Sequence, residues 1–416
     1  MLRQEAEGKH HKQQQVQSST TSSGSNTQQQ QQQSSTTSSG SNAQQQQQQQ
    51  SSTTSSGNTS TTQQQQSSAS STTGTSSSTG TVTASSGCTL SGTYKFGTDI
   101  SSCAAVVIDS LSVPEGVTLD LTKTKSGATI EFTGTTTFGT QTWEGPLVLL
   151  SGSDLTVKGS GTLDGQGDWY WKQGTSISRP VFFRLHAVTG STLSGFTLKN
   201  SPFRTFSILN SEKTTISGLT LDSSAGDGKA KNTDGFDLSR NDGVSITGNK
   251  IYNQDDCLAM QSSTNTVFSN NYCSGGHGVS IGSLGGDSVT SSDTVSGLTV
   301  SGNTIVNSVN GIRIKTIIGL QGLVSNAKYT NNKLQNVKNA IVIHSDYSKS
   351  KGGYTGSATS QVTIQGVSIS GLSGTATNLY DVVANPKVVS DWTFSDITVT
   401  ASSKGSCSGQ PSSITC

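Results

Sequence analysis

Residues 246–273 read ITGNKIYNQDDCLAMQSSTNTVFSNNYC, and this stretch contains one six-residue phrase twice, as ITGNKI and as FSNNYC. In each phrase an apolar residue is followed by small polar residues that include Gly or Asn, and then by a second apolar residue. Gly and Asn accept a positive φ, which a tight bend needs, and the alternation around the bend places apolar side chains on one face. Each phrase therefore predicts two short strands joined by a tight turn.

The same phrase recurs outside this stretch, as LSGFTL from Leu193, ISGLTL from Ile216, VSGNTI from Val300, YTNNKL from Tyr329, IQGVSI from Ile364 and FSDITV from Phe394. The intervals between successive copies are 23, 30, 22, 32, 29, 35 and 30 residues. One unit cannot bury its apolar face alone, so the units must stack, at about 4.8 Å per coil. Propeller blades are longer, at about 40 residues, and leucine-rich repeats need a Leu/Asn pattern that this chain lacks. The spacing predicts an all-β fold consisting of a single parallel β-helix.

The first part of the chain differs from the rest, because residues 9–86 are almost entirely Gln, Ser, Thr, Gly and Asn. Such a segment has too little apolar surface to offset the backbone entropy lost on ordering. We therefore expect a disordered low-complexity tail over residues 1–87 and one folded domain over residues 88–416, which is long enough for a single core. A short capping helix is expected over residues 103–108.

Charge and hydropathy exclude two classes of partner. The formal net charge is +1, and no basic run follows the first dozen residues, which argues against nucleic acid or an anionic membrane. The sequence contains no run of 18 apolar residues, so no transmembrane helix is predicted. The first residues, MLRQEAEGKHHK, lack the apolar segment of a signal peptide. Secretion is therefore expected from the cysteines and from the enzyme class argued below.

All six cysteines follow the tail. An even number in a chain without C-x-x-C favours disulfides and an oxidising compartment over buried free thiols. Sequence alone allows 15 pairings. Neighbouring coils would bring sequence neighbours together, so the simplest prediction consists of the pairs Cys88–Cys103, Cys257–Cys273 and Cys407–Cys416.

Four polar clusters interrupt the repeat, at Asn232–Asp234, Asn253–Cys257, Gly276–Gly278 and Arg313–Lys315. Asp234 and Asp255 are 21 residues apart, as are Asp256 and His277, and this separation is close to one short coil. Residues one coil apart become neighbours in a stacked fold, so three carboxylates and a histidine are predicted to share one face. Each cluster alone is a common turn or surface feature. The prediction rests on all four together, in order and at coil spacing.

These residue types indicate a chemistry. Crowded carboxylates repel one another, which raises at least one pKa toward that of a useful general acid. Glycoside hydrolysis needs such a protonated carboxyl opposite an ionised one. Arg313 and Lys315, two residues apart on one strand, would bind the carboxylate of a negatively charged sugar. The pattern therefore indicates an enzyme that acts on an acidic polysaccharide.

The chain resembles the polygalacturonases of glycoside hydrolase family 28, especially the fungal-type endo-acting enzymes. The strings that carry the resemblance are NTDGFD (232–237), NQDDCLA (253–259), GGHGVSIGS (275–283) and NGIRIKT (310–316), together with GTLDGQGDWYW (161–171) and VIHSDY (342–347). The resemblance covers residues 88–416. It implies that this segment is a catalytic domain built as a right-handed, pectin lyase-like parallel β-helix.

The resemblance also implies a role for each matching residue. Asp255 would be the general acid, and His277 would tune its protonation. Asp234 and Asp256 would activate water for a single inverting displacement. Substrate binding would fall to Arg313, Lys315, Tyr347, Asn232 and Gly276. No metal or organic cofactor is implied.

The predicted function is endo-acting hydrolysis of α-1,4-galacturonosyl linkages in de-esterified pectin, by a monomer whose partner is polygalacturonic acid. An exo-acting relative would carry extra loops that close the cleft, and an inactive pectin-binding homologue would have lost the aspartates. A rhamnogalacturonan hydrolase would vary the NTD and GHG strings, and a pectate lyase would use calcium and an arginine base. Two departures near the expected cleft, His344 in place of Gln and Arg240 in place of a small polar residue, leave subsite preference and pH optimum open.

Overall fold

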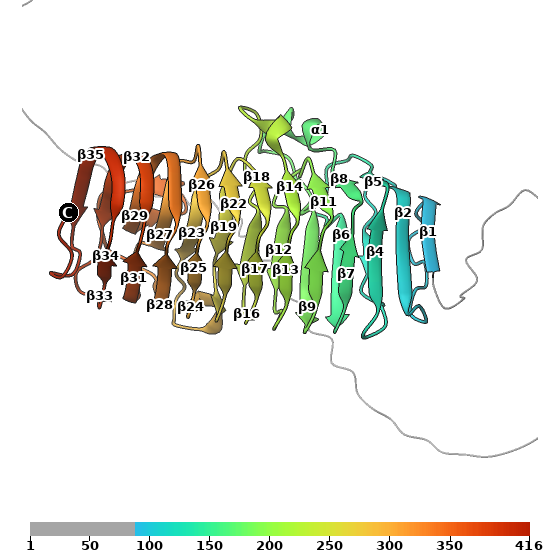
Figure 1. The fold of residues 1–416 in the computed structure, drawn as a ribbon, viewed down its shortest axis with the longest axis horizontal. Coiled ribbons are helices and arrows are strands. Elements are labelled where there is room, and N and C mark those ends of the chain that lie inside the picture. The colour runs from blue at the N-terminus through green and yellow to red at the C-terminus, as the bar shows by residue number, and fades with distance from the viewer. Residues whose placement is uncertain (1–87) are drawn as a thin grey trace, which may run out of the picture. The chain divides into compact units, whose positions relative to one another are not determined.

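The computed structural model describes residues 88–416, which form one parallel β-helix drawn in Figure 1. The coils follow one another in chain order, from β1 at one end to β35 at the other. The strand pairs of this segment are parallel, except for β29 with β30. The predicted all-β class and the single parallel β-helix are confirmed. The expected disordered tail, residues 1–87, lies outside the described residues.

The strands stack into three long faces and a shorter fourth ladder, each holding strands from successive coils. Face I contains β3 (Leu119–Leu121), β6 (Val148–Ser153), β9 (Phe183–Thr189), β12 (Phe206–Leu209), β15 (Phe236–Ser239), β19 (Asp256–Met260), β23 (Gly278–Leu284), β27 (Asn310–Ile317), and the later parts of β29 (Lys333–Ser348), β32 (Ser373–Val383) and β35 (Thr398–Ser408).

Face II contains β1 (Cys88–Thr93), β2 (Ala105–Val113), β4 (Thr129–Thr133), β7 (Thr156–Gly159), β10 (Thr192–Ser194), β13 (Thr215–Ser217), β17 (Ser245–Thr247), β21 (Val267–Ser269), β25 (Thr299–Ser301), β28 (Gln321–Thr330), β31 (Gln361–Ser370) and β34 (Thr393–Ser395). Face III contains β5 (Thr135–Phe138), β8 (Thr162–Asp164), β11 (Thr197–Lys199), β14 (Thr220–Asp222), β18 (Lys250–Tyr252), β22 (Tyr272–Ser274), β26 (Thr304–Val306) and the first parts of β29, β32 and β35.

The fourth ladder contains β16 (Asn241–Asp242), β20 (Ser263–Thr264), β24 (Thr294–Ser296), the first parts of β28 and β31, and β33 (Val389–Ser390). The remaining elements are the strand β30 (Gly353–Tyr354), which forms a hairpin with β29, the helix α1 (Gly167–Trp171) and the 3₁₀ turns η1 (Ser224–Gly226) and η2 (Ser291–Asp293). The capping helix expected over residues 103–108 is wrong. Strand β2 begins at Ala105, and its buried Val106 and Ile108 alternate with less buried neighbours, which is the period of a strand.

The repeated phrase forms the corner between faces II and III. Its first residues lie in one register column, in which Leu193 pairs with Ile216, and Ile216 with Ile246. The third position, Gly or Asn, takes a positive φ, as at Gly248 (φ 67) and Asn270 (φ 55). The phrases therefore turn as predicted.

The copy at Ile364 is the exception to this register. Tyr329 pairs with Ile369 rather than with Ile364, and Ile369 pairs in turn with Phe394. Ile364 instead pairs with Val324 and Val389, one corner earlier in the coil. The interval of 35 residues that ends at Ile364 therefore does not measure a coil, because β31 runs through the corner at Gly366 and carries the pattern from the fourth ladder into face II.

A ladder of buried asparagines supports these turns from inside. Asn271 accepts the backbone N–H of Asn249 at 2.9 Å, and Asn303 accepts that of Asn271 at 2.8 Å. Asn332 likewise accepts the backbone N–H of Asn303 at 3.0 Å. Buried backbone groups at a bend need such partners, so one amide per coil satisfies the turn of the coil before it.

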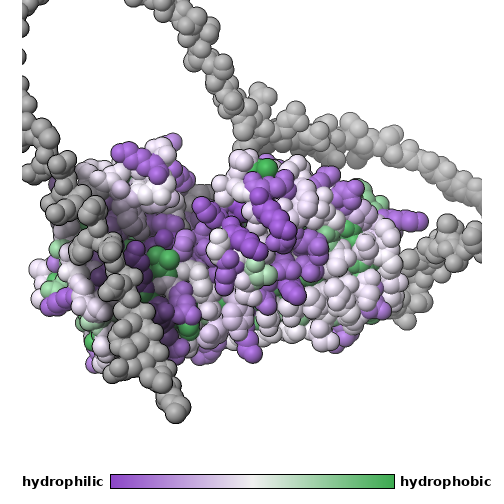
Figure 2. All heavy atoms as spheres, turned by 90° about the horizontal axis from the view of Figure 1, so that it is seen from above, coloured by the Kyte–Doolittle hydropathy of each residue, from purple (hydrophilic) through white to green (hydrophobic). Residues whose placement is uncertain are grey.

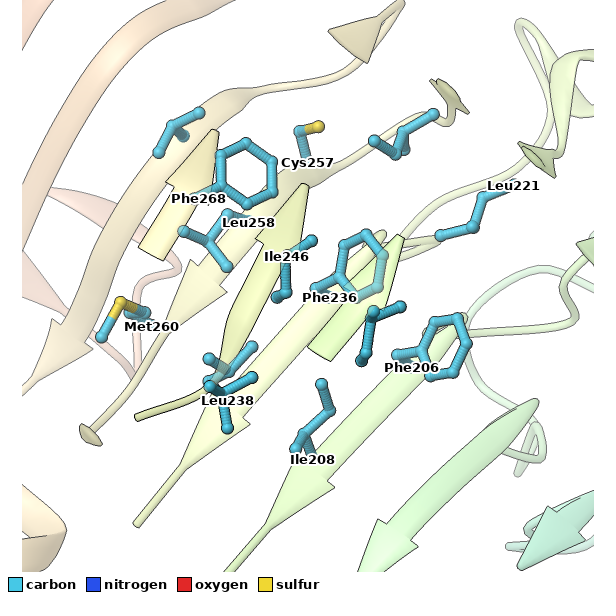
Figure 3. Close-up of a cluster of buried hydrophobic side chains, with 14 of the residues drawn as sticks. Phe206, Ile208, Leu221, Phe236, Leu238, Ile246, Cys257, Leu258, Met260 and Phe268 are labelled. Atoms are coloured by element: carbon cyan, nitrogen blue, oxygen red, sulfur yellow. The ribbon is translucent and has the colours of Figure 1, made fainter. Parts of the chain in front are cut away.

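The core is a column of apolar side chains inside the coils, shown in part in Figure 3. Phe206 and Phe236, on adjacent strands of face I, stack with ring centroids 5.1 Å apart, and Phe183 lies 5.3 Å from Phe206. Full burial of each such ring stabilises the fold by about 1.5–3 kcal/mol. Figure 2 shows the outside of the same coils as mostly hydrophilic, with scattered hydrophobic side chains.

The three predicted disulfides are present, joining Cys88 to Cys103, Cys257 to Cys273 and Cys407 to Cys416, with Cα atoms 5.9, 5.9 and 6.1 Å apart. Cys257 and Cys273 lie in adjacent coils, as the stacking argument expects. None of the helices in residues 88–416 has the length and apolar character needed to cross a bilayer.

Candidate active site

The candidate site lies where the chain turns from face III into face I. Asp234 precedes β15, Asp255 and Asp256 stand at the start of β19, and His277 precedes β23. These three turns are stacked coil on coil. The predicted convergence of the aspartates and the histidine is therefore what the fold produces.

Buried polar contacts hold the three turns together. The side-chain amide of Asn253 donates to the carbonyl oxygens of Thr233 (3.0 Å), Asp255 (2.9 Å) and Asp256 (3.0 Å). The turns are also closely packed, because a Cβ on Gly276 would lie 2.1 Å from the carbonyl oxygen of Asp255. Gly276 therefore allows the coil of His277 to lie directly against the coil of Asp255.

Asp255 is bonded to the coils on both sides. Its Oδ1 lies 2.9 Å from Nδ1 of His277, and its Oδ2 accepts a hydrogen bond from the Asn232 amide at 3.2 Å. Burial raises the pKa of Asp255, but the hydrogen bond and charge of His277, with the charge of Lys315, hold that pKa below the usual range of an aspartate. The side chain of His277 is 36% exposed, so this pair is in contact with solvent.

Asp256 is the carboxylate that the cations surround. Its Oδ1 accepts hydrogen bonds from Ser280 Oγ at 2.7 Å and from the guanidinium of Arg313, and Lys315 Nζ lies 3.7 Å from Oδ2. Arg313 also donates to Ser280 Oγ at 2.9 Å. This charge-assisted network fixes the Asp256 carboxylate. It also places two positive charges at the mouth of the aspartate cluster.

Asp234 and Asp237 form a second buried carboxylate pair. Burial, followed by the nearby charge of Asp237, raises the pKa of Asp234 well above its usual range. Burial likewise raises the pKa of Asp237 to about 7, although the charge of Arg204 opposes the shift. Asp234 Oδ1 also accepts the backbone N–H of Asp256 at 3.1 Å. The two halves of the cluster thus differ, because the pKa is raised at Asp234 and Asp237 and lowered at Asp255.

These groups line a cavity of about 400 Å³. All the sequence-predicted catalytic and binding residues except Gly276 are among its lining residues. Gly276 is buried beneath the cavity and acts through the packing just described. Tyr347 covers the cationic side, with Lys315 Nζ 5.5 Å from its ring centroid.

Several residues of the site were not predicted from the sequence. Arg204 Nε lies 3.7 Å from Oδ2 of Asp234 and 3.3 Å from Oδ2 of Asp237. Asp237 lies in the string NTDGFD, three residues after Asp234. The alternation of a strand would place these two side chains on opposite faces, but both line the same cavity. Arg204 precedes β12, whose Phe206 pairs with Phe236. That register could have placed Arg204 beside Asp234 had the irregular coil length been known.

Three residues of this site are of the types that bind metal ions. Ligand atoms of Asp255, Asp256 and His277 lie within 4.8 Å of one another. However, the Asp256 carboxylate is already bound by Arg313 and Lys315. Two fixed positive charges at this carboxylate oppose a further cation. The donor set therefore suits an anionic ligand better than a metal ion.

The two departures from the family pattern have different surroundings. His344 is buried, with Nδ1 2.7 Å from Asp346 Oδ1, Nε2 3.0 Å from Asp381 Oδ1, and its ring stacked 3.7 Å from that of Tyr354. Arg240 is exposed, bonds Asn210 at 3.0 Å and is not among the residues that line the cavity. His344 therefore supports the wall next to Tyr347, which pairs with Tyr354 in the hairpin β29–β30.

Comparison with known proteins gives consistent results. The sequence pattern of glycosyl hydrolases family 28 matches residues 103–416. A polygalacturonase of Cochliobolus carbonum is 43% identical over 345 residues, which are 80% of this chain and 93% of the relative. An endo-polygalacturonase of Sclerotinia sclerotiorum is 43% identical over 327 residues, which are 76% of this chain and 84% of the relative.

Two solved structures share the fold. The endo-xylogalacturonan hydrolase of Aspergillus tubingensis superimposes with a TM-score of 0.67 at 26% identity, covering 79% of this chain and 98% of that one. Endopolygalacturonase I of Stereum purpureum, complexed with two galacturonate, gives a TM-score of 0.55 at 25% identity, covering 78% of this chain and all of that one.

Proposed function

Because the chain belongs to glycosyl hydrolases family 28, we propose that it hydrolyses α-1,4-galacturonosyl linkages inside chains of de-esterified pectin. The observation that carries this proposal is the meeting of Asp234, Asp255 and Asp256 in one cavity beside Arg313 and Lys315. Carboxylates supply the acid and base of glycoside hydrolysis, and the two cations suit a sugar that carries a carboxylate. The named polygalacturonases at 43% identity support the same substrate.

Binding begins at the cationic side of the cavity. Arg313 and Lys315 would bind the carboxylate of one galacturonate unit, with Arg313 held in place by Ser280 and Asp256. Tyr347 lies over Lys315 and offers an aromatic face to the sugar ring. Asn232 bonds Asp255, so a sugar that contacts this amide is positioned against the acid. Orientation of this kind supplies a large part of the lowering of the barrier.

Proton donation is assigned to Asp255, with His277 as its partner. The pKa of Asp255 is lowered in the free protein by His277 and Lys315. Asp255 can act as the acid only if substrate binding raises this pKa and the carboxyl takes up a proton. A substrate carboxylate at Lys315 offsets one of those charges and excludes water, and both effects raise the pKa of Asp255. His277 reaches solvent, so the pair can regain a proton after each turnover. The proton passes from Asp255 to the glycosidic oxygen as the C–O bond breaks.

Water activation is assigned to Asp234 and Asp256. The two residues are joined through the Asp256 N–H and Asp234 Oδ1. Arg313 and Lys315 both contact the Asp256 carboxylate and hold it in place. A water held between the two residues would lose its proton to the Asp256 carboxylate as its oxygen attacks the anomeric carbon, giving one displacement with inversion. Asp234, whose pKa burial raises, would orient this water. No cofactor enters these steps.

A second candidate substrate is xylogalacturonan, because one solved structure that shares the fold, with a TM-score of 0.67, is an endo-xylogalacturonan hydrolase. Its identity of 26% is well below the 43% of the polygalacturonases, which favours unsubstituted galacturonan. An exo-acting enzyme or an inactive homologue would need a closed cleft or lost carboxylates. The cavity here retains all three aspartates.

Incubation with de-esterified polygalacturonate tests the proposal. Reducing ends and product sizes are followed over time, with xylogalacturonan in parallel. Early release of oligomers of mixed length is expected. Release of monomer alone would establish exo-action, and preferential cleavage of xylogalacturonan would select the second candidate. Unsaturated products that absorb in the ultraviolet would show that the enzyme cleaves by elimination rather than by hydrolysis.

We also propose that residues 88–416 carry the whole activity, and that the protein is a secreted monomer without nucleic-acid or membrane partners. The three disulfides support an oxidising destination. A protein limited to residues 88–416 should match the specific activity of the full chain and elute as a monomer. Reduced activity would assign a catalytic contribution to residues 1–87.

A further inference from the structure

A second pocket, of about 380 Å³, adjoins the active cavity on the side of the earlier coils. The two share Arg204 and Asn232 among their lining residues. We call its basic part the arginine pocket, and define it as Arg179, Arg184, Arg204 and Phe203. Nothing in the mechanism above uses Arg184 or Phe203.

The arginine pocket concentrates positive charge around one aromatic ring. The guanidinium carbons of Arg179 and Arg204 lie 4.9 and 5.0 Å from the centroid of Phe203. Burial, followed by the charge of Arg204, lowers the pKa of Arg184. Like charges held this close repel, so the arrangement favours an anion that approaches all of them.

Within residues 88–416, most of this charge lacks an ion-pair partner, although Glu144 also lines the pocket and its charge acts on Arg184. Among residues 88–416, the ion pairs of these arginines are those of Arg204 with Asp234 and Asp237. Arg179 bonds neutral oxygens, at 2.7 Å to the carbonyl of Lys231 and at 3.0 Å to Oδ1 of Asn232. Within the described part of the chain, Arg184 Nε is buried without a hydrogen-bond partner. A buried donor on a charged group is costly when unpaired, and a ligand oxygen would pair it.

The position of Arg184 relates this charge to the active site. Arg184 pairs with Ser207, Ser207 with Asp237, and the same register column continues through Ala259 and Ser280 to Arg313. At about 4.8 Å per coil, Arg184 lies roughly 10 Å from Asp237 and roughly 24 Å from Arg313. A polymer lying along face I, across the strands, would therefore meet a cation at each end of this column.

We propose that the arginine pocket binds a carboxylate of the same acidic polymer, several sugar units away from the linkage that is cleaved. This inference rests on the proposed function, and it adds a specificity determinant for chain length and for free acid groups. A short oligomer bound at Arg313 does not reach Arg184. A methyl ester on the distant unit removes the charge that the pocket recognises.

Arg184→Gln tests the proposal, with Arg184→Lys as the variant that keeps the charge. Lys158→Gln is the matched control, because Lys158 is an exposed cation on β7 of face II. On polygalacturonate and long oligogalacturonates, Arg184→Gln should lower kcat/KM roughly 10-fold through KM, the effect expected of one charge-assisted contact. On the shortest oligomer that is cleaved, kcat/KM should stay unchanged. Arg184→Lys should recover part of the loss, and Lys158→Gln should match the native enzyme.

An equal effect of Arg184→Gln on short and long oligomers, or none on either, overturns the arginine pocket as a binding site. Melting temperatures are measured alongside. If Arg184→Gln does not fold, Arg184→Lys is compared with the native enzyme on long and short oligomers, and an equal effect on both again overturns the proposal. A native enzyme that cleaves no galacturonan contradicts the proposed function instead. In that case calorimetric titration with a long oligogalacturonate still tests the pocket. Equal affinity of the native and Arg184→Gln proteins would overturn it there too.

Discussion

His277 Nδ1 lies 2.9 Å from Asp255 Oδ1, across two coils whose residues are 22 positions apart in the chain. The contact joins the most exposed member of the cluster to the carboxyl assigned as the acid. It is also the main reason why the pKa of Asp255 is lowered despite burial. The protonation of the acid is therefore set by a neighbouring coil rather than by the strand that carries it.

Replacement of His277 by Ala tests this relationship. Without the hydrogen bond and charge of His277, burial dominates and raises the pKa of Asp255. The acid then stays protonated to higher pH, so the alkaline limb of the kcat/KM profile should move upward. The maximal rate should fall about 10²- to 10⁴-fold, the usual contribution of acid–base catalysis. His186→Ala, at an exposed position of β9, is the control. An alkaline limb that stays in place would separate His277 from Asp255.

Lys315→Ala should mainly weaken substrate binding. The ammonium group lies beside Asp256 and under Tyr347, where it would meet the galacturonate carboxylate. Loss of one such charge-assisted contact corresponds to about a 10-fold rise in KM on polygalacturonate. Lys250→Ala, on face III, provides a matched loss of charge. Unchanged KM in the Lys315 variant would remove this residue from the binding site.

Asp237→Asn should change how stability depends on pH. The folded-state pKa of Asp237 is about 7, above the ordinary value of an unfolded aspartate, so the native state binds the extra proton. The stability that this proton contributes is complete below about pH 4 and is lost as the pH rises to 7. The melting temperature of the native protein should fall over this window, and that of Asp237→Asn should fall less. Identical slopes would show that Asp237 is ionised throughout.

The stereochemistry of the product is a separate test. Oxygens of Asp255 and Asp256 lie within 4.8 Å of one another, a spacing shorter than the roughly 6.5–9.5 Å common in inverting enzymes. Even so, inversion is expected, because Ser280 and Arg313 bond the Asp256 carboxylate and reduce its strength as a nucleophile. Proton NMR of the first product formed distinguishes inversion from retention of the anomeric configuration. Retention of configuration would make one of these carboxylates a nucleophile.

Sequence patterns sufficed for the fold because the repeated phrase is local. Gly248 and Asn270 reveal their turns through residue type alone, and alternation reveals the buried face. The phrase at Ile364 shows the limit of that approach, since the apolar pattern of β31 continues through the corner at Gly366. Only the pairing of Tyr329 with Ile369 identifies the true coil.

The active site was predictable to the extent that coil spacing is regular. Asp234, Asp255 and Asp256 lie in short coils, so a separation of 21 residues indicated their contact. Arg204 belongs to a coil enlarged by the segment between β14 and β15, and no fixed spacing connects it with Asp234. Arg184 is two coils from Asp237, and its unpaired charge becomes visible only when the neighbouring side chains are known.

The central claim is that carboxylates from successive coils act as one catalytic unit, and a mutant cycle on the turnover of polygalacturonate tests it. Asp255→Asn, Asp256→Asn and the double variant are compared with the native enzyme, and folding of each is checked by its melting temperature. Residues that work as a unit give strongly non-additive losses. Each single variant should lose about 10²- to 10⁴-fold in kcat, and the double variant should lose little more. Losses that multiply, or a single variant that keeps a near-native rate, would contradict the account.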